Sequence, residues 1–591
     1  MERRVLLAIF LAFLVLYVWQ AVFVKPVPKT AAGTAPSSAA QPAAATPAGG
    51  TETPPGALPV PTPAAAPGRA PSAAALVGDA SERDVRIETR DVIAVFTNRG
   101  ARLKSWRLKH YLDRQRQPQE LIESQIPTQP LPFTLRTADE AATAILNDAL
   151  YTVTGAPGEA PIESAVDVHF EYRDTSGVHA IKEFHLEPAA YVVAFRPTIT
   201  VGDRAVVPTI VWGPAVGDIA EASRYAQKPE GLLFANGKVQ RLAAKDIAKQ
   251  AAHEGEFKYA GVDDNYFMTI ALSPGVSKVG FQPISIPPPA TSKDPARDLM
   301  AYDIQTHDAD KPVKFFVGPK DFDVLAATDR DLTGAINFGM FTVIVVPLLR
   351  SLKWVNSYVG NWGFSIVILT ILINVIMFPL RHKGVVSMRK MQEIQPEVKA
   401  IQDRYSKLKA TDPAKQKMNQ ELMALYRERG VNPAGGCVPM LLTMPVLLAM
   451  WALLSTAIEL RGAPFVGWIH DLTAHDPLYI TPVIMGVSQL WQQKMTPSAG
   501  MDPAQQRMMM LMPIVFTVMF LWLPAGVAIY YAVTNLWGIG QQYLTNYLIG
   551  PPKVRTIRPP GERRMKRAGA GKTDAAGKAK LSTTEDTVDT E

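Results

Sequence analysis

The stretch "NWGFSIVILTILINVIMFPLRHK", residues 361–383, decides the fold. It holds no Asp, Glu, Lys, Arg or His before Arg381, and a single amide, Asn374, interrupts its apolar core. About 20 apolar residues in a helix cross the ~30 Å hydrocarbon core of a bilayer. The sequence therefore predicts a membrane-spanning helix over residues 362–380 with one polar side chain halfway along it.

Further apolar stretches of similar length predict more spans. Four follow the first, at 437–458, 477–493, 508–523 and 526–549. A sixth opens the chain as "MERRVLLAIFLAFLVLYVWQAVFVKP", which we interpret as an uncleaved anchor over residues 1–24, because bulky Val22, Phe23 and Val24 stand where a signal peptide has small residues. Removal as a signal peptide is the alternative. The predicted fold class is a polytopic α-helical membrane protein with six transmembrane helices.

A water-soluble region separates the anchor from the other spans. Residues 25–81 are mostly Pro, Ala, Gly, Ser and Thr, which predicts a disordered tether. Residues 82–328 contain runs that alternate apolar and polar residues, such as "VRIETRDVIAVFTNRGARLKSWRL" and "HAIKEFHLEPAAYVVAFRPTITV", separated by turn residues. These runs predict an antiparallel β-sandwich of one domain.

Residues 329–361 contain an apolar run too short to span a bilayer, because Arg350 and Lys353 interrupt it. An amphipathic helix lying at the membrane surface fits this pattern. The alternative is a buried core helix of the sandwich.

The basic residues predict the orientation. Segment 381–434 holds twelve Lys or Arg and segment 553–580 holds ten, whereas the loop 461–476 has only Arg461. The positive-inside rule then places both termini and segment 381–434 in the cytoplasm and the sandwich outside it. The net charge of +7 comes largely from these segments, so it indicates contact with anionic lipid, and with the ribosome through the basic, disordered tail 551–591, rather than with DNA.

A cytoplasmic helical hairpin is predicted over residues 382–434. Apolar residues recur there at spacings of three and four, with a break expected at Pro396 and a second helix beginning after Asp412 and Pro413. The apolar residues that define the pattern are Met388, Met391, Ile394, Val398, Ile401, Tyr405, Leu408, Met418, Leu422 and Leu425. The hairpin is either a connector or an arm that binds a partner.

No pattern for covalent chemistry is present. The sequence lacks a nucleotide-binding loop, a zinc motif, a nucleophile triad and a carboxylate pair in a span, and Cys437 is the only cysteine. We therefore expect no enzyme activity, cofactor or metal. Polar residues inside the spans, among them Gln489 and Asn535, either bond neighbouring helices or line a hydrated recess. A channel or transporter is an alternative, although the spans hold no ionisable group; an anchored sugar-active enzyme is another.

Several long strings resemble one family. They include "VNPAGGCVPMLLTMPVLLAMWALL" (431–454), "ELRGAPFVGWIHDLTAHDPLYI" (459–480) and "AIYYAVTN" (528–535). With the stretch at 361–383 they resemble the YidC family of bacterial membrane protein insertases, in its Gram-negative form. The resemblance implies an insertase and chaperone of the inner membrane that takes up nascent membrane proteins, alone or beside the Sec translocon and its accessory subunits. It also implies a five-helix core around a groove and a periplasmic supersandwich.

The resemblance also implies site residues. Thr370 and Tyr531 match groove residues of the family, whereas Asn374 stands where the family usually has arginine. We expect Asn374 to face a hydrated groove and to contribute polarity without charge. We interpret Arg381 as a topogenic charge, with inward snorkelling as the alternative. The full candidate set is Thr370, Asn374, Tyr531, Tyr530, Gln489 and Asn535 for the client-binding groove, and Met388, Met391, Arg389, Arg404, Arg563 and Arg564 for cytoplasmic contacts with client or ribosome.

Overall fold

The computed structural model describes most of the chain between residues 74 and 550. Inside this range it leaves out residues 114, 125, 127, 159, 217–226, 273–274, 287–296, 307, 309, 406–413, 433–437 and 496–502. The chain divides into two units, Met1–Ala70 and Pro71–Glu591, and all described residues belong to the second. The predicted anchor 1–24, most of the tether and the tail 551–591 lie outside the described residues.

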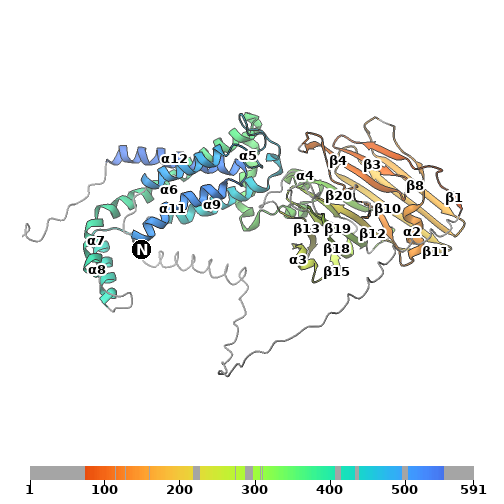
Figure 1. Cartoon of the computed structure of the whole chain (residues 1–591), viewed down its shortest axis with the longest axis horizontal. Helices are drawn as coiled ribbons and strands as arrows, with labels where there is room; N and C mark the ends of the chain where they lie inside the picture. Colours follow the sequence, from red (N-terminus) through yellow and green to blue (C-terminus); the bar gives the residue numbers. More distant parts are fainter. Residues whose placement is uncertain are drawn as a thin grey trace, which may run out of the picture. The chain divides into compact units, whose positions relative to one another are not determined.

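The first half of the described chain is an antiparallel β domain (Figure 1). Its largest sheet has 11 strands among the described residues, and its backbone path runs β1-β8-β9-β10-β20-β17-β16-β13-β14 with β7 on β8 and β11 on β10. These strands are β1 Ala75–Val77, β7 Thr152–Thr154, β8 Val166–Asp174, β9 Val178–Leu186, β10 Val192–Val201, β11 Arg204–Ala205, β13 Glu230–Ala235, β14 Lys238–Leu242, β16 Tyr259–Asp263, β17 Phe267–Ala271 and β20 Val313–Pro319.

Two smaller sheets complete the β domain. One has the order β15-β18-β19-β12-β6 and the other the order β2-β3-β4-β5. Their bounds are β2 Asp84–Glu88, β3 Val92–Thr97, β4 Arg102–Leu112, β5 Pro118–Glu120, β6 Thr134–Arg136, β12 Thr209–Ala215, β15 Ala252–Phe257, β18 Val276–Ile286 and β19 Arg297–Thr306, with short helices α2 Glu140–Asp148, α3 Ala244–Ile247 and α4 Phe322–Thr328. Strand β1 corrects the predicted tether, which must end before residue 75.

One aromatic cluster joins the sheets into a single core. Phe133 contacts Phe184 of β9 at 5.0 Å between ring centroids, Trp212 of β12 at 5.1 Å and Phe315 of β20 at 5.2 Å. These rings come from strands of two different sheets, so the sheets pack face to face. The alternation read from the sequence is confirmed, since every second residue of β9 is buried.

Lys182 occupies one of these inward positions of β9. Its ammonium group donates to the carbonyl oxygens of Gly100 at 2.6 Å and Phe133 at 2.9 Å. Burial lowers the pKa of Lys182 well below its usual value. One buried lysine therefore ties two loops together inside an otherwise apolar core.

The second half of the described chain is helical. Helices coincide with all five predicted spans after the anchor: α6 Trp362–Glu393, α9 Val438–Thr456, α10 Ile480–Met495, α11 Pro503–Phe520 and α12 Ala525–Ile549. Among the described residues only α6 has both the length and the apolar composition to cross a bilayer, while Thr443–Thr456 and Met510–Phe520 are shorter apolar helices. The remaining elements are η1 Arg330–Ala335, η2 Gly339–Phe341, α5 Thr342–Val359, α7 Gln395–Arg404, α8 Ala414–Glu428 and η4 Ile458–Leu460.

Helix α6 differs from its prediction. It does not end at residue 380 but continues through Pro379 to Glu393. The break expected near Pro396 is present, because α7 begins at Gln395 with Pro396 in its first turn. Met388 and Met391 therefore belong to the extension of α6 and not to the hairpin helix, which is α7. The predicted start of the second hairpin helix at Asp412 and Pro413 lies outside the described residues.

Helix α5 packs on the other helices. Its buried residues Val345, Leu349, Leu352 and Val355 form one stripe, and the helix contacts α6 and α9. The helix is amphipathic and packs on α6 and α9, so the alternative of a core helix in the β-sandwich is wrong, whereas its place at the membrane surface stays a prediction.

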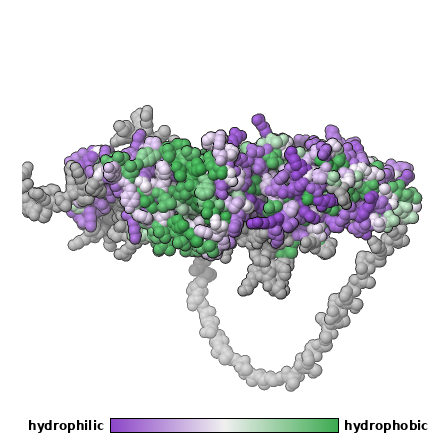
Figure 2. Space-filling view, turned by 90° about the horizontal axis from the view of Figure 1, so that it is seen from above, coloured by the Kyte–Doolittle hydropathy of each residue, from purple (hydrophilic) through white to green (hydrophobic). Residues whose placement is uncertain are grey.

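The helices of the bundle approach one another closely. In Figure 1, α6, α9, α11 and α12 run alongside one another. A Cβ atom built on Gly486 of α10 would lie 2.0 Å from Thr517 Oγ1 of α11, so only glycine fits there. Figure 2 shows a band of hydrophobic residues over this part, bounded by hydrophilic surface. Exposed members of the bundle surface include Ile376, Leu441, Val487, Trp491, Leu511 and Val515.

Candidate functional site

Asn374 is the centre of a polar contact inside the bundle. Its amide nitrogen donates to Thr370 O at 2.8 Å, and its amide oxygen accepts from Arg381 Nη1 at 2.6 Å. Residues 374 and 381 are seven apart, which is about two helical turns, so both side chains share one face of α6. Asn374 is only 2% exposed, and Arg381 is half-buried.

The contact corrects the interpretation of Arg381. We interpreted it as a topogenic charge at the interface, but its guanidinium turns back along α6 and binds Asn374. It also lies within electrostatic reach of Tyr530 on α12. The snorkelling alternative is therefore the correct one, and a positive charge does lie beside Asn374.

Thr370 is fully buried one turn before Asn374. Its hydroxyl donates to Ile366 O at 2.6 Å, the bond that a helical threonine makes to its own preceding turn. The hydroxyl therefore satisfies its donor within α6, and its carbonyl oxygen receives the Asn374 amide. Thr370, Asn374 and Arg381 thus form one continuous polar line along α6.

The two tyrosines of α12 lie edge to face, with ring centroids 5.3 Å apart. Tyr530 is buried within electrostatic reach of Arg381. Tyr531 is half-buried and packs on Phe520 of α11 at 5.0 Å, and Phe520 contacts Trp451 of α9 at 6.0 Å. Tyr531 therefore belongs to an aromatic cluster that joins α9, α11 and α12.

Asn535 has a packing role. Its amide donates to Met485 O at 3.2 Å and Ser488 Oγ at 3.3 Å, both on α10. This is the helix-bonding alternative given for polar residues of the spans. Gln489, also on α10, is half-buried.

The cytoplasmic candidates divide into two groups. Arg389 is 6% exposed, and its guanidinium donates to Gly550 O at 2.7 Å and to Asn546 Oδ1. It caps the last turn of α12, where carbonyls lack helical partners. The Arg389 guanidinium therefore binds within the chain, and its contact with a client or ribosome stays a prediction. Arg404 is exposed and pairs with Glu421 at 3.0 Å, and Arg563 and Arg564 lie outside the described residues.

The helical hairpin uses its apolar stripe internally. Ile394, Val398 and Val431 form a small core, with Met391, Leu422, Leu425 and Tyr426 packed around it. Glu397 and Arg429 close it with N–O distances of 2.9 and 3.0 Å. Met388 is half-buried. In the described part of the chain, no group of three or more His, Cys, Asp or Glu is arranged to hold a metal ion.

Family comparisons cover almost the whole described chain. Residues 354–551 match the family described as 60Kd inner membrane protein, and residues 84–351 match the family described as YidC periplasmic domain. A membrane protein insertase YidC of Geobacter metallireducens is 33% identical over an alignment of 575 residues that covers 94% of this chain and 100% of the relative.

Solved structures give more distant likenesses. An active YidC insertase crystal structure with its first transmembrane domain resolved is 18% identical, with 80% of this chain and 94% of that chain covered and a TM-score of 0.34. A galactose mutarotase related enzyme from Lactobacillus acidophilus is 9% identical, with 40% and 97% covered and a TM-score of 0.26.

Proposed function

We propose a client-binding site on the premise that this chain belongs to the YidC family of membrane protein insertases. The chain is accordingly an inner membrane protein that acts on nascent membrane proteins without enzymatic chemistry, and its β domain is periplasmic. The proposal is that a client segment meets the polar line Thr370–Asn374–Arg381 of α6, with Arg381 as the attracting group.

One observation carries the proposal: the 2.6 Å hydrogen bond from Arg381 Nη1 to Asn374 Oδ1. An amide oxygen orients a guanidinium but does not neutralise it. Arg381 therefore keeps a net positive charge inside the bundle, where a charge acts more strongly than in water. A carboxylate or backbone carbonyl on a client can accept from the remaining N–H donors of the guanidinium.

Photo-crosslinking tests this assignment. A photoreactive amino acid is placed at position 370, 374, 381 or 531, and a ribosome-bound nascent client is supplied. We expect adducts from 374 and 381, and from 531 if the client also reaches the aromatic cluster. A matched control at Val375, which is half-exposed on the outer side of α6, should give far fewer client adducts. Equal yields from 375 and 381 would remove the assignment.

We further infer a six-span topology with both termini in the cytoplasm. Five helices at the predicted spans, the hydrophobic band of Figure 2 and the basic segment 381–434 support it. Labelling of single introduced cysteines in a Cys437→Ser background tests it. With a membrane-impermeant thiol reagent added on the periplasmic side, a cysteine at position 278 on β18 should react at once. A cysteine at position 399 on α7 should react only after the membrane is permeabilised.

Partners beyond the client are proposed from charge and family. The basic residues beside the spans suit anionic lipid, and those of the tail suit ribosomal RNA. The Sec translocon with its accessory subunits is proposed as a second route by which clients arrive. Removal of residues 553–580 should lower ribosome co-sedimentation without lowering insertion of a client released from the ribosome. Unchanged co-sedimentation would contradict a ribosome-binding tail.

A further inference from the structure

The loop that follows α9 contacts the β domain through Arg461. Its guanidinium donates from Nη1 to Leu112 O at 2.8 Å and from Nη2 to Gln119 Oε1 at 2.8 Å. Leu112 ends β4, and Gln119 lies in β5. Just before Arg461, Ile458 and Leu460 of η4 are buried, so the segment itself is anchored.

The same guanidinium lies over two aromatic rings of the β domain. The ring centroids of Phe267 and Tyr266 are 5.1 and 6.0 Å from Arg461 Cζ, within the range of cation–π attraction. Beside them, Asn265 donates from its amide to Ser455 O at 3.3 Å. Ser455 is in the last turn of α9, where carbonyls have no helical partner, so Asn265 caps that helix.

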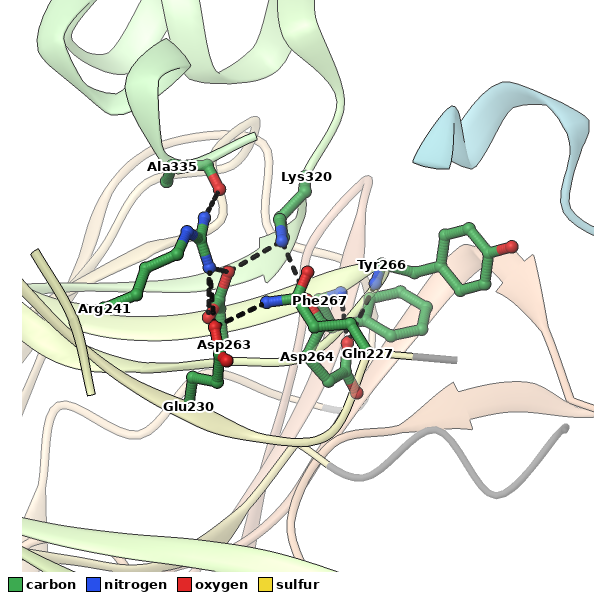
Figure 3. A network of polar contacts seen from close by, with 9 residues as sticks. All are labelled: Gln227, Glu230, Arg241, Asp263, Asp264, Tyr266, Phe267, Lys320 and Ala335. Atoms are coloured by element: carbon green, nitrogen blue, oxygen red, sulfur yellow. Dashed lines mark hydrogen bonds and ion pairs between the residues drawn. The ribbon is translucent and has the colours of Figure 1, made fainter. Parts of the chain in front are cut away.

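Hydrogen bonds from within the β domain hold the turn that presents these residues, Asp264–Phe267. Figure 3 shows how it is held. The Asp264 carboxylate accepts from the backbone N–H groups of Tyr266 at 2.9 Å and Phe267 at 2.8 Å. The Asp264 carbonyl accepts from Lys320 Nζ at 2.7 Å, and Lys320 also pairs with Asp263 Oδ2 at 2.7 Å. The β domain therefore shapes the turn and presents its two rings to Arg461.

The same network reaches the chain that leads to α5. Arg241 binds both oxygens of Asp263, at 3.1 and 2.9 Å, and donates to Ala335 O at the end of η1. A second tie lies nearby, because Lys353 of α5 pairs with Asp323 in the first turn of α4 at 2.7 Å. The charges of Asp263, Lys320 and Arg241 therefore hold both the turn that contacts Arg461 and the chain segment that connects the β domain to α5.

We propose that the turn Asp264–Phe267, with Gln119 and the Leu112 carbonyl, is a socket for Arg461, which fixes the periplasmic end of α9 to the β domain. The socket is specific for arginine, because two separate acceptors and two ring faces match a planar guanidinium and not a point charge. The β domain and the bundle then stay joined while a client passes. This last consequence rests on the insertase function of the family.

Hydrogen–deuterium exchange on the full chain in detergent tests the socket. Arg461→Ala should speed exchange about tenfold both in residues 265–267 and in the last turn of α9. Arg461→Lys should give an intermediate effect, and the exposed Lys249→Ala on the β domain should give none. Faster exchange on the α9 side alone would overturn the proposal, because it would show that the β domain does not hold that end.

Crosslinking tests whether the joint stays closed. In a Cys437→Ser background, Asn265→Cys and Ser455→Cys are joined by a short bis-maleimide, with each single variant treated alike as control. We expect the crosslink to form readily and client insertion to continue at the rate of the untreated double variant. Loss of insertion on crosslinking would show that the joint must open, and failure to crosslink in an insertion-competent protein would show that it is absent. Either result overturns the proposal, whereas the untreated variants report the insertase function itself.

Discussion

Lys320 of the β domain and Arg381 of the bundle are both basic side chains that turn inward, but their partners differ. Lys320 meets the carboxylate of Asp263, which also binds Arg241, and Glu230 lies 3.5 Å from Arg241, so two basic and two acidic groups neutralise one another. Arg381 meets the neutral amide of Asn374. A neutralised charge can only hold structure, whereas a charge oriented by a neutral group keeps its field for another molecule. Four predictions follow this contrast, in order of decreasing size.

Removal of the shared carboxylate should have the largest effect. Asp263→Asn leaves the buried Lys320 without a counter-charge and removes one of the two carboxylates beside Arg241, which costs about 3–5 kcal/mol. Denaturant unfolding of the full chain in detergent, followed by proteolysis of the β domain, measures the loss. Glu230→Gln is the control, because Glu230 is part-exposed and 3.5 Å from Arg241. A cost below ~1 kcal/mol for Asp263→Asn would mean that the network is not structural.

Lys182→Met should cost about 2 kcal/mol, because the carbonyls of Gly100 and Phe133 lose their buried donor. Lys182 also predicts how the stability of the folded chain depends on pH. Since burial lowers the folded-state pKa of Lys182 below the ordinary 10.5, the unfolded chain binds more protons between the two values. Stability should therefore rise with pH across that interval in the native sequence. The variant should lose this rise; an unchanged slope would assign it to another group.

Arg381→Gln should slow insertion of a client with an acidic inserted segment about tenfold, equivalent to ~1.4 kcal/mol. A client without acidic residues should be affected less, and the stability of the chain should change little. Lys383→Gln, which removes an exposed charge two residues away, is the matched control. Equal slowing by both variants would show that only the overall cytoplasmic charge matters.

Asn374→Leu should have the smallest effect, about a threefold slowing confined to acidic clients, since Arg381 keeps its charge but loses its orienting acceptor. Val375→Leu on the outer face of α6 is the control. Normal insertion by Asn374→Leu together with a defect in Arg381→Gln would show that Arg381 needs no orientation. Normal insertion by both variants would show that Asn374 and Arg381 only contribute to helix packing.

The elements were readable from the sequence because they follow local periodicity. The alternation of apolar and polar residues predicted the strands β9 and β10, and the length of the apolar stretches predicted the helices α6 and α9–α12. What periodicity could not give is the direction of long side chains. Lys182 sits at an inward position of an alternating strand, and its acceptors lie 82 and 49 residues away in the chain. Arg389 follows the same pattern, because the end of α12 that it caps is 161 residues distant. Such roles exist only once the tertiary contact has formed.

The sequence allows only part of the Asn374–Arg381 contact to be predicted. A spacing of seven on one helix places two side chains on one face, and that spacing could have suggested the contact. The competing expectation, a basic residue marking the interface, assumed that α6 ends near Pro379. The helix instead continues to Glu393, so Arg381 lies within it and can fold back. Because the predicted end of α6 was too early, the inward contact of Arg381 was not predicted.

The uninterrupted length of α6 has a mechanical consequence. Its 32 residues make a rod ~48 Å long at 1.5 Å per residue, against a hydrocarbon core of ~30 Å. The hairpin of α7 and α8 follows directly from its C-terminal end, and Arg389 fastens the end of α12 to the same stretch. A tilt of about 5° about the N-terminal end of α6 would displace its C-terminal end by about 4 Å. The length of α6 therefore lets a small tilt at one end displace α7 and α8 at the other.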